Sequence, residues 1–104
     1  MKNSAGLSAI FEVQENKRSR VKGVLHFSTV TALLRPGSEA IAGGHATVVD
    51  LAGVSDSDSA GLALLIEWLS VAKTESRGLR YENIPAQLQQ LARLSEVEEL
   101  LTAS

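Results

Sequence analysis

Two aspartates and a serine stand where the sequence changes from an apolar run to a long helical pattern. Asp56, Asp58 and Ser59 follow the apolar run 46–51 and directly precede a helix that we expect over 59–75. A side-chain oxygen at such a place can cap free backbone N–H groups. The same N–H groups and the helix dipole also stabilise a phosphate. Ser59 is therefore interpreted as a plain helix cap or as a site of phosphorylation.

Catalytic interpretations of these residues have weaker support. Asp50, Asp56 and Asp58 could hold Mg²⁺ with water ligands, but such aspartates more often cap turns and helix starts. Ser59 as a nucleophile needs a histidine base, and neither of the two histidines has an obvious acid–base partner in the sequence. A Gly-x-Ser-x-Gly elbow and a Gly-rich phosphate loop are both missing from the sequence. We predict a protein that is not an enzyme and uses no metal or cofactor.

The composition indicates one ordinary globular domain. The chain has 104 residues, of which 44% are hydrophobic and 21% charged, and it has no cysteine. A net charge of −2 argues against a nucleic-acid-binding face. Lys17, Arg18, Arg20 and Lys22 form a small basic cluster, which is interpreted as a solvated turn rather than a lipid contact. No secretory signal or membrane span is expected, so the prediction is a cytoplasmic domain over 1–104 with residues 1–8 flexible.

Hydrophobic periodicity predicts an α/β fold with the element order β-β-α-β-α-β-α. The sheet is expected to have four strands in a mixed arrangement, with helices packed against it. We expect strands at 9–13, 20–27, 46–51 and 79–84. The third strand is apolar enough to be buried on both faces, and a polar loop should follow it over 52–59. Helices are expected from Ser28 or Thr29 to Ala42 with a break at Pro36–Gly37, over 59–75, and from Pro85 onward.

The helix over 59–75 is apolar on two sides. One stripe of three- and four-residue spacing is interpreted as core: Leu62, Leu65, Ile66, Leu69 and Ala72. Leu64, Trp68 and Val71 form a second stripe, with Gly61 one turn earlier. The last helix or the C-terminal segment could cover the second stripe. Alternatively, an exposed Trp68 could anchor a protein interface, because tryptophan is enriched among binding hot spots. Self-association through this helix also stays open.

The sequence around Ser59 resembles a known family. Asp58-Ser59-x-Gly61-Leu62, after a buried strand that ends in Asp50-Leu51, is similar to the signature of STAS domains. The run from Ser59 to Leu69 resembles more specifically the MlaB-like STAS proteins, and so does the segment from Leu79 to Leu101. The likeness extends over nearly the whole chain from Ile10 and is tightest from Val48 onward.

The resemblance implies a binding function without catalysis. MlaB-like proteins bind the ATPase subunit, MlaF, of an ABC complex that moves phospholipids and maintains the lipid asymmetry of the outer membrane. They do so through the helix that starts at the Ser/Thr position. Carried over residue by residue, the partner-binding residues are Ser59, Ala60, Gly61, Leu64 and Trp68. The protein would lie at the cytoplasmic face of the inner membrane and contact the membrane only through the complex.

The same resemblance leaves an alternative from another class. STAS domains include the anti-sigma factor antagonists, which are regulated by phosphorylation of the serine that matches Ser59. Many STAS proteins have Gly-Glu-Leu-Asp where this chain has Gly23-Val24-Leu25-His26, so an acidic residue beside that serine is missing. This departure weakens the phosphorylation hypothesis and leaves the docking hypothesis unchanged.

Overall fold

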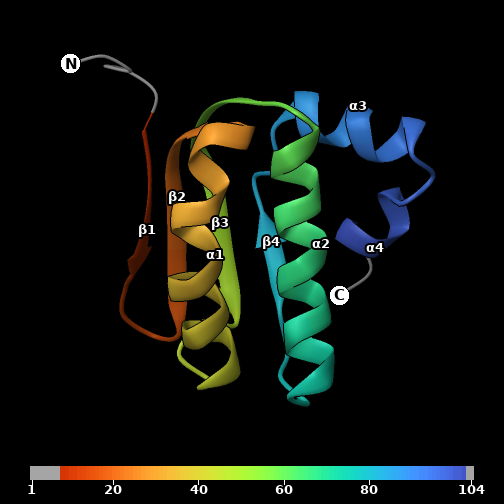
Figure 1. Cartoon of the computed structure of the whole chain (residues 1–104). Helices are drawn as coiled ribbons and strands as arrows, with labels where there is room; N and C mark the ends of the chain where they lie inside the picture. Colours follow the sequence, from red (N-terminus) through yellow and green to blue (C-terminus); the bar gives the residue numbers. More distant parts are fainter. Residues whose placement is uncertain (1–7, 103–104) are drawn as a thin grey trace.

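A four-stranded mixed sheet organises the chain in the computed structural model, which describes residues 8–102. The strands lie in the order β1-β2-β3-β4; β1 is antiparallel to β2, and the other neighbours are parallel (Figure 1). The elements are β1 (Ala9–Val13), β2 (Arg18–Leu25), α1 (Phe27–Ala42), β3 (Val48–Ser57), α2 (Ser59–Thr74), β4 (Arg80–Glu82), α3 (Ala86–Leu94) and α4 (Glu98–Thr102). The predicted fold class is confirmed, with α4 as an additional short helix.

The first two strands form the predicted hairpin. Asn16 and Lys17 have φ angles of 60° and 61°, as the central residues of a type I′ turn require. Of the segment expected to be flexible, residues 1–7 lie outside the described residues. The carbonyl of Ser8 accepts a hydrogen bond of 2.9 Å from the Val24 N–H, so the hairpin ladder extends to that residue.

The two long helices lie side by side on the same face of the sheet (Figure 1). Each follows one parallel strand and precedes the next, so α1 and α2 run in the same direction. Their inner sides, the facing side of the sheet and part of α3 make one core. Its largest fully buried side chains are Trp68, Leu25, Ile41, Leu51, Leu65 and, from α3, Leu88. At the C-terminal end Leu101 is buried, whereas Leu100 is half exposed.

The expected break at Pro36–Gly37 does not occur. Helix α1 continues through Pro36 to Ala42. Gly37 is buried against the indole of Trp68, and a Cβ atom there would lie 2.2 Å from Cζ2 of the ring. The glycine that we interpreted as a helix breaker is therefore a packing residue, which lets α2 bring its largest side chain against α1.

The expected loop at 52–59 is largely strand. β3 extends to Ser57 and keeps its pairing with β2 through two register shifts, between Arg20 and Lys22 and between Gly23 and Val24. The small residues that suggested a loop accommodate this irregular pairing: a Cβ at Gly53 would lie 2.7 Å from Cγ of Lys22.

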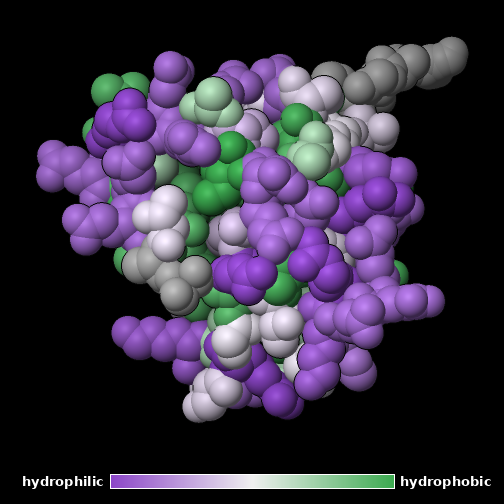
Figure 2. All heavy atoms as spheres, turned by 180° about the vertical axis from the view of Figure 1, so that it is seen from behind, coloured by the Kyte–Doolittle hydropathy of each residue, from purple (hydrophilic) through white to green (hydrophobic). Residues whose placement is uncertain are grey.

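The opposite face of the sheet is largely polar, so the prediction of a strand buried on both faces holds for only part of β3. Val48 and Val49 point to opposite faces and are both buried, whereas Asp50 is half-buried on the polar face. Seen from behind, hydrophilic side chains cover much of the molecule (Figure 2). The register aligns Glu12, Arg20, Asp50 and Glu82 across all four strands. Glu12 accepts a hydrogen bond from Arg20 at 2.8 Å, and Arg18 pairs with Glu82. The basic cluster of the first hairpin is thus largely neutralised within the sheet.

Candidate protein-docking site

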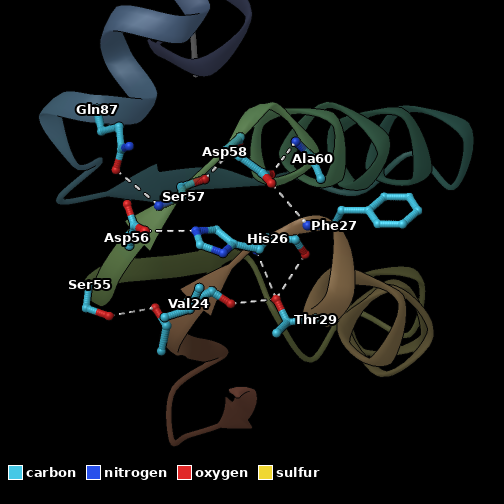
Figure 3. A network of polar contacts seen from close by, with 11 residues as sticks. Val24, His26, Phe27, Thr29, Ser55, Asp56, Ser57, Asp58, Ala60 and Gln87 are labelled. Atoms are coloured by element: carbon cyan, nitrogen blue, oxygen red, sulfur yellow. Dashed lines mark hydrogen bonds and ion pairs between the residues drawn. The ribbon is translucent and has the colours of Figure 1, made fainter. Parts of the chain in front are cut away.

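A single carboxylate joins the N-terminal ends of the two long helices. Asp58 is the N-cap of α2, and its Oδ1 accepts the N–H of Ala60 at 2.8 Å. Its Oδ2 accepts the N–H of Phe27, the first residue of α1, at 3.2 Å (Figure 3). The expectation that Ser59 is the cap is wrong, because Asp58 takes that position and leaves Ser59 exposed as the first helical residue.

Helix α1 begins earlier than expected and is capped by a different pair. Its N-cap is His26, not Ser28 or Thr29. The hydroxyl oxygen of Thr29 accepts the backbone N–H of His26 at 3.0 Å, as the third residue of a capping box does. Thr29 is buried, and its hydroxyl also donates to the carbonyl of Val24 at the end of β2. This contact fixes the start of α1 against the sheet.

Other polar side chains at this end of the sheet bind either one another or the backbone (Figure 3). Nε2 of His26 lies 2.8 Å from Oδ2 of Asp56, an acidic partner that the sequence did not reveal. The hydrogen bond from His26 holds the pKa of Asp56 below its ordinary value. Oε1 of Gln87, on α3, accepts the N–H of Ser57 at 3.1 Å. Within residues 8–102, no group of three histidine or acidic side chains could hold a metal ion.

The structure separates the five predicted partner-binding residues. Ser59 is exposed, Ala60 is partly exposed, and Leu64 is 4% exposed at the base of a groove. Gly61 is buried, and a Cβ atom there would lie 2.1 Å from Oγ of Ser57. Gly61 therefore allows α2 to approach the end of the sheet and is not part of an accessible surface.

The expectation of an exposed Trp68 is wrong. Its side chain is 0% exposed, packs on Gly37, and lies with its ring centroid 5.3 Å from that of Phe11. Its indole N–H donates to the carbonyl of Leu34 at 3.3 Å. The cover is supplied by α1 and β1, not by the last helix or the C-terminal segment. Trp68 is a core residue, because α1 meets the side of α2 that we expected to face a partner.

An open apolar groove runs along the outside of the α1–α2 pair. Its volume is about 340 Å³, and its lining residues come from both helices: Val30, Thr31, Leu34, Ala60, Ala63, Leu64 and Glu67. Leu34 is 40% exposed at the groove, and Phe27 is 82% exposed at the start of α1, where its N–H meets Asp58. Exposed aromatic and aliphatic side chains around an apolar groove are typical of a protein-binding surface.

Sequence reasoning missed the contribution of α1 to this surface. Phe27, Val30 and Leu34 recur at three- and four-residue spacing, on a different side of the helix from the buried Leu33 and Gly37. This second apolar stripe is present in the sequence, but a helix interrupted at Pro36–Gly37 would not have formed a continuous surface with α2.

The fold and the groove define a small STAS-type domain. A family model described as "Mlab, STAS domain" matches residues 6–102, so the chain belongs to this family. The domains of this family are generally non-catalytic binding or regulatory domains. None of the curated protein sequences compared with the chain matches it significantly.

Two solved structures have a similar fold. One is the Bacillus cell fate determinant SpoIIAA in its phosphorylated form, with 17% identity, a TM-score of 0.65, and coverage of 86% of this chain and 84% of that one. The other is the anti-sigma factor antagonist SpoIIAA in its unphosphorylated form, with 17% identity, a TM-score of 0.64, and coverage of 83% and 82%. Among the described residues, no helix has the length and apolarity that crossing a membrane requires.

Proposed function

We propose that this chain is a non-catalytic accessory subunit that binds the MlaF-like ATPase subunit of an ABC-type phospholipid transport complex. Such a complex maintains the lipid asymmetry of the outer membrane, and the chain would lie at the cytoplasmic face of the inner membrane through its partner. Membership of the MlaB STAS family supports the class of partner. The observation that carries the proposal is the apolar groove between α1 and α2, which begins beside Ser59 and Ala60.

The docking surface proposed here differs in part from the one expected from the sequence. It keeps Ser59, Ala60 and Leu64 and adds residues of α1, above all Phe27 and Leu34. Burying a phenylalanine that is exposed in the free protein contributes about 1.5–3 kcal/mol. Phe27 is 82% exposed, so most of that free energy is available to an interface. The subunit acts by binding, and hydrolysis of ATP belongs to the partner.

A co-purification experiment with a matched control tests this proposal. The ATPase subunit of the same cells is co-expressed with the wild-type chain, with Phe27→Ser, or with Leu94→Ser. Phe27 and Leu94 are both 82% exposed, but Phe27 begins α1, one turn before the groove residue Val30, whereas Leu94 lies on α3. We expect Phe27→Ser to weaken binding at least about tenfold, equivalent to about 1.4 kcal/mol, and Leu94→Ser to bind normally. Equal binding of both variants would contradict the docking surface that Phe27 and the groove form.

A function regulated by phosphorylation of Ser59 has one specific observation in its favour. Ser59 is exposed at the start of α2, so a kinase could reach its hydroxyl, and one of the similar structures is of a phosphorylated protein. The alternative function is therefore an anti-sigma factor antagonist regulated by phosphorylation of Ser59. Against it, Asp58 already occupies the N–H groups of Phe27 and Ala60, and Asp58 and Asp56 place negative charge near Ser59.

Mass spectrometry separates the two functions. The chain is incubated with the serine kinases of the same cells and ATP, alongside Ser59→Ala as the control. A phosphoryl group gained by the wild-type chain and absent from Ser59→Ala would favour the antagonist. Recovery of the ABC ATPase with an unmodified chain would favour the transporter subunit.

A further inference from the structure

At the edge of the sheet formed by β1, the backbone groups on one side have no partner strand within residues 8–102. Among the described strands, β1 pairs only with β2, and Figure 1 shows it at the free edge. The N–H of Gln14 donates to Arg18, and the N–H of Val24 donates to Ser8, which fixes the alternation of the ladder. Since hydrogen-bonded residues alternate in an antiparallel pair, Ile10 and Glu12 bond to β2. The N–H and C=O groups of the intervening residues therefore point outward: Ala9, Phe11 and Val13.

This edge has few of the features that usually prevent strands from pairing, and its one charged residue is Glu12. Its sequence, Ala-Ile-Phe-Glu-Val, contains neither lysine nor proline, and its register with β2 is continuous without a bulge. Ile10 is 47% exposed and Val13 is 59% exposed. The other edge of the sheet is different, because β4 has three residues and α4 packs beside it.

We infer that β1 is a self-association edge, on which a second copy of the chain adds its own β1 antiparallel about a two-fold axis at Phe11. In this register the outward-pointing residues face one another: Phe11 faces Phe11 of the other copy, and Ala9 faces Val13. All three outward-pointing residues of each copy then exchange backbone hydrogen bonds. The exposed Val13 side chain gains an apolar neighbour.

The charges on the polar face are compatible with this pairing. Ile10 and Glu12 point to that face, where Glu12 lies opposite Arg20 and Ile10 lies opposite Lys22. In the two-fold register, Glu12 of one copy lies opposite Ile10 of the other. Each anion thus remains beside its own Arg20 and faces an apolar side chain. Lys22 of the other copy lies on the next strand, β2 of that copy, beside its Ile10.

The predicted association is weak and does not depend on the docking groove. One pair of short strands buries less than the roughly 800 Å² per partner of a standard interface, so the dimer should form at high concentration. The groove lies between α1 and α2 and contains no residue of β1. Self-association can therefore be tested on the full chain alone, and its failure would leave the proposed function untouched.

Cysteine cross-linking tests the register, because the chain contains no cysteine of its own. In the inferred dimer, residues 10 and 12 of different copies form a non-hydrogen-bonded pair with Cα atoms about 4.5 Å apart. That separation allows a disulfide. Two copies of residue 10 are diagonal neighbours about 7–8 Å apart, which is too far. Ile10→Cys and Glu12→Cys proteins are mixed under a mild oxidant, with Leu94→Cys as the control for random collisions.

We expect a disulfide-linked dimer when Ile10→Cys is mixed with Glu12→Cys. We expect no such dimer when either variant is oxidised alone or is mixed with Leu94→Cys. The wild-type chain should sediment with a weight-average mass that rises with concentration from 11.0 kDa towards twice that value. Efficient cross-linking of Ile10→Cys with itself would overturn the register at Phe11. A wild-type chain that stays at 11.0 kDa at every concentration would overturn the self-association edge itself.

Discussion

Replacing Gly37 by alanine tests the packing contact between Gly37 and the buried indole of Trp68. A methyl group at position 37 would lie 2.2 Å from Cζ2 and 2.4 Å from Cε2 of the indole. The ring is fully buried, so it cannot move aside into solvent. Because the methyl group would have to displace a buried ring, we take the upper end of the usual overpacking cost, about 3 kcal/mol.

The same substitution also has a stabilising effect. Alanine favours a helix by about 1 kcal/mol over glycine. The expected net loss in the free energy of unfolding is therefore about 2 kcal/mol, which lowers Tm by about 8–16 °C in a domain of this size. Thermal unfolding followed by circular dichroism measures this shift. Trp68 is the chain's single tryptophan, so its fluorescence should move to longer wavelength if the indole is pushed out of its site.

Gly78→Ala is the matched control. A Cβ atom at Gly78 meets nothing within 4 Å, so this variant should keep its Tm or gain slightly through the loss of unfolded-state entropy. If Gly37→Ala were as stable as Gly78→Ala, the indole would not rest on Gly37. The original hypothesis of an exposed Trp68 would then be open again.

Three further predictions concern buried or charged groups. Ser19→Ala should raise the free energy of unfolding, measured in urea, by about 1 kcal/mol, because the Ser19 hydroxyl is buried and has no hydrogen-bond partner among the residues that the structure describes. Asp58→Ala should lower the free energy of unfolding by about 2 kcal/mol, since the Asp58 carboxylate accepts one backbone N–H at the start of each long helix, at about 1 kcal/mol for each contact. Asp56→Ala should lower it less, because the Asp56 side chain is more exposed. The hydrogen bond from Arg18 lowers the pKa of Glu82, so the folded state binds that proton less tightly than the unfolded state. Stability from Glu82 is thus present above the ordinary carboxyl value of about 4.3 and lost as the pH falls below it. The fall in Tm between about pH 6 and pH 3 should be smaller in Glu82→Gln.

The sequence predicted the element order, the mixed sheet and the limits of α2, because these depend on local periodicity. It did not predict which neighbour covers each side of a helix that is apolar all round. The four-residue spacing of Leu64 and Trp68 places them on one side of α2, but only the packing of α1 determines that this side is buried. Gly37 was the one indication in the sequence of where Trp68 packs, since a glycine inside a helix can admit a large side chain from a neighbour.

The sequence predicted where the site at the N-terminal ends of the helices lies, but not which residues cap the helices or pair with one another. The segment from Asp56 to Ser59 does lie where α2 begins, yet the cap of α2 is Asp58, whose carboxylate also accepts the first N–H of α1. That sharing joins residues 31 positions apart in the sequence, so no local pattern could reveal it. The pairing of His26 with Asp56 was hidden for the same reason.

The placement of both long helices on one side of the sheet gives the molecule a front and a back. A partner seated between α1 and α2 approaches from the front, and the row of ion pairs on the back then points away from it. In any such assembly the domain would cover its neighbour's apolar surface and expose the ion-paired face of the sheet to water. A second partner that bound this face would meet arginine and glutamate side chains that already bind each other.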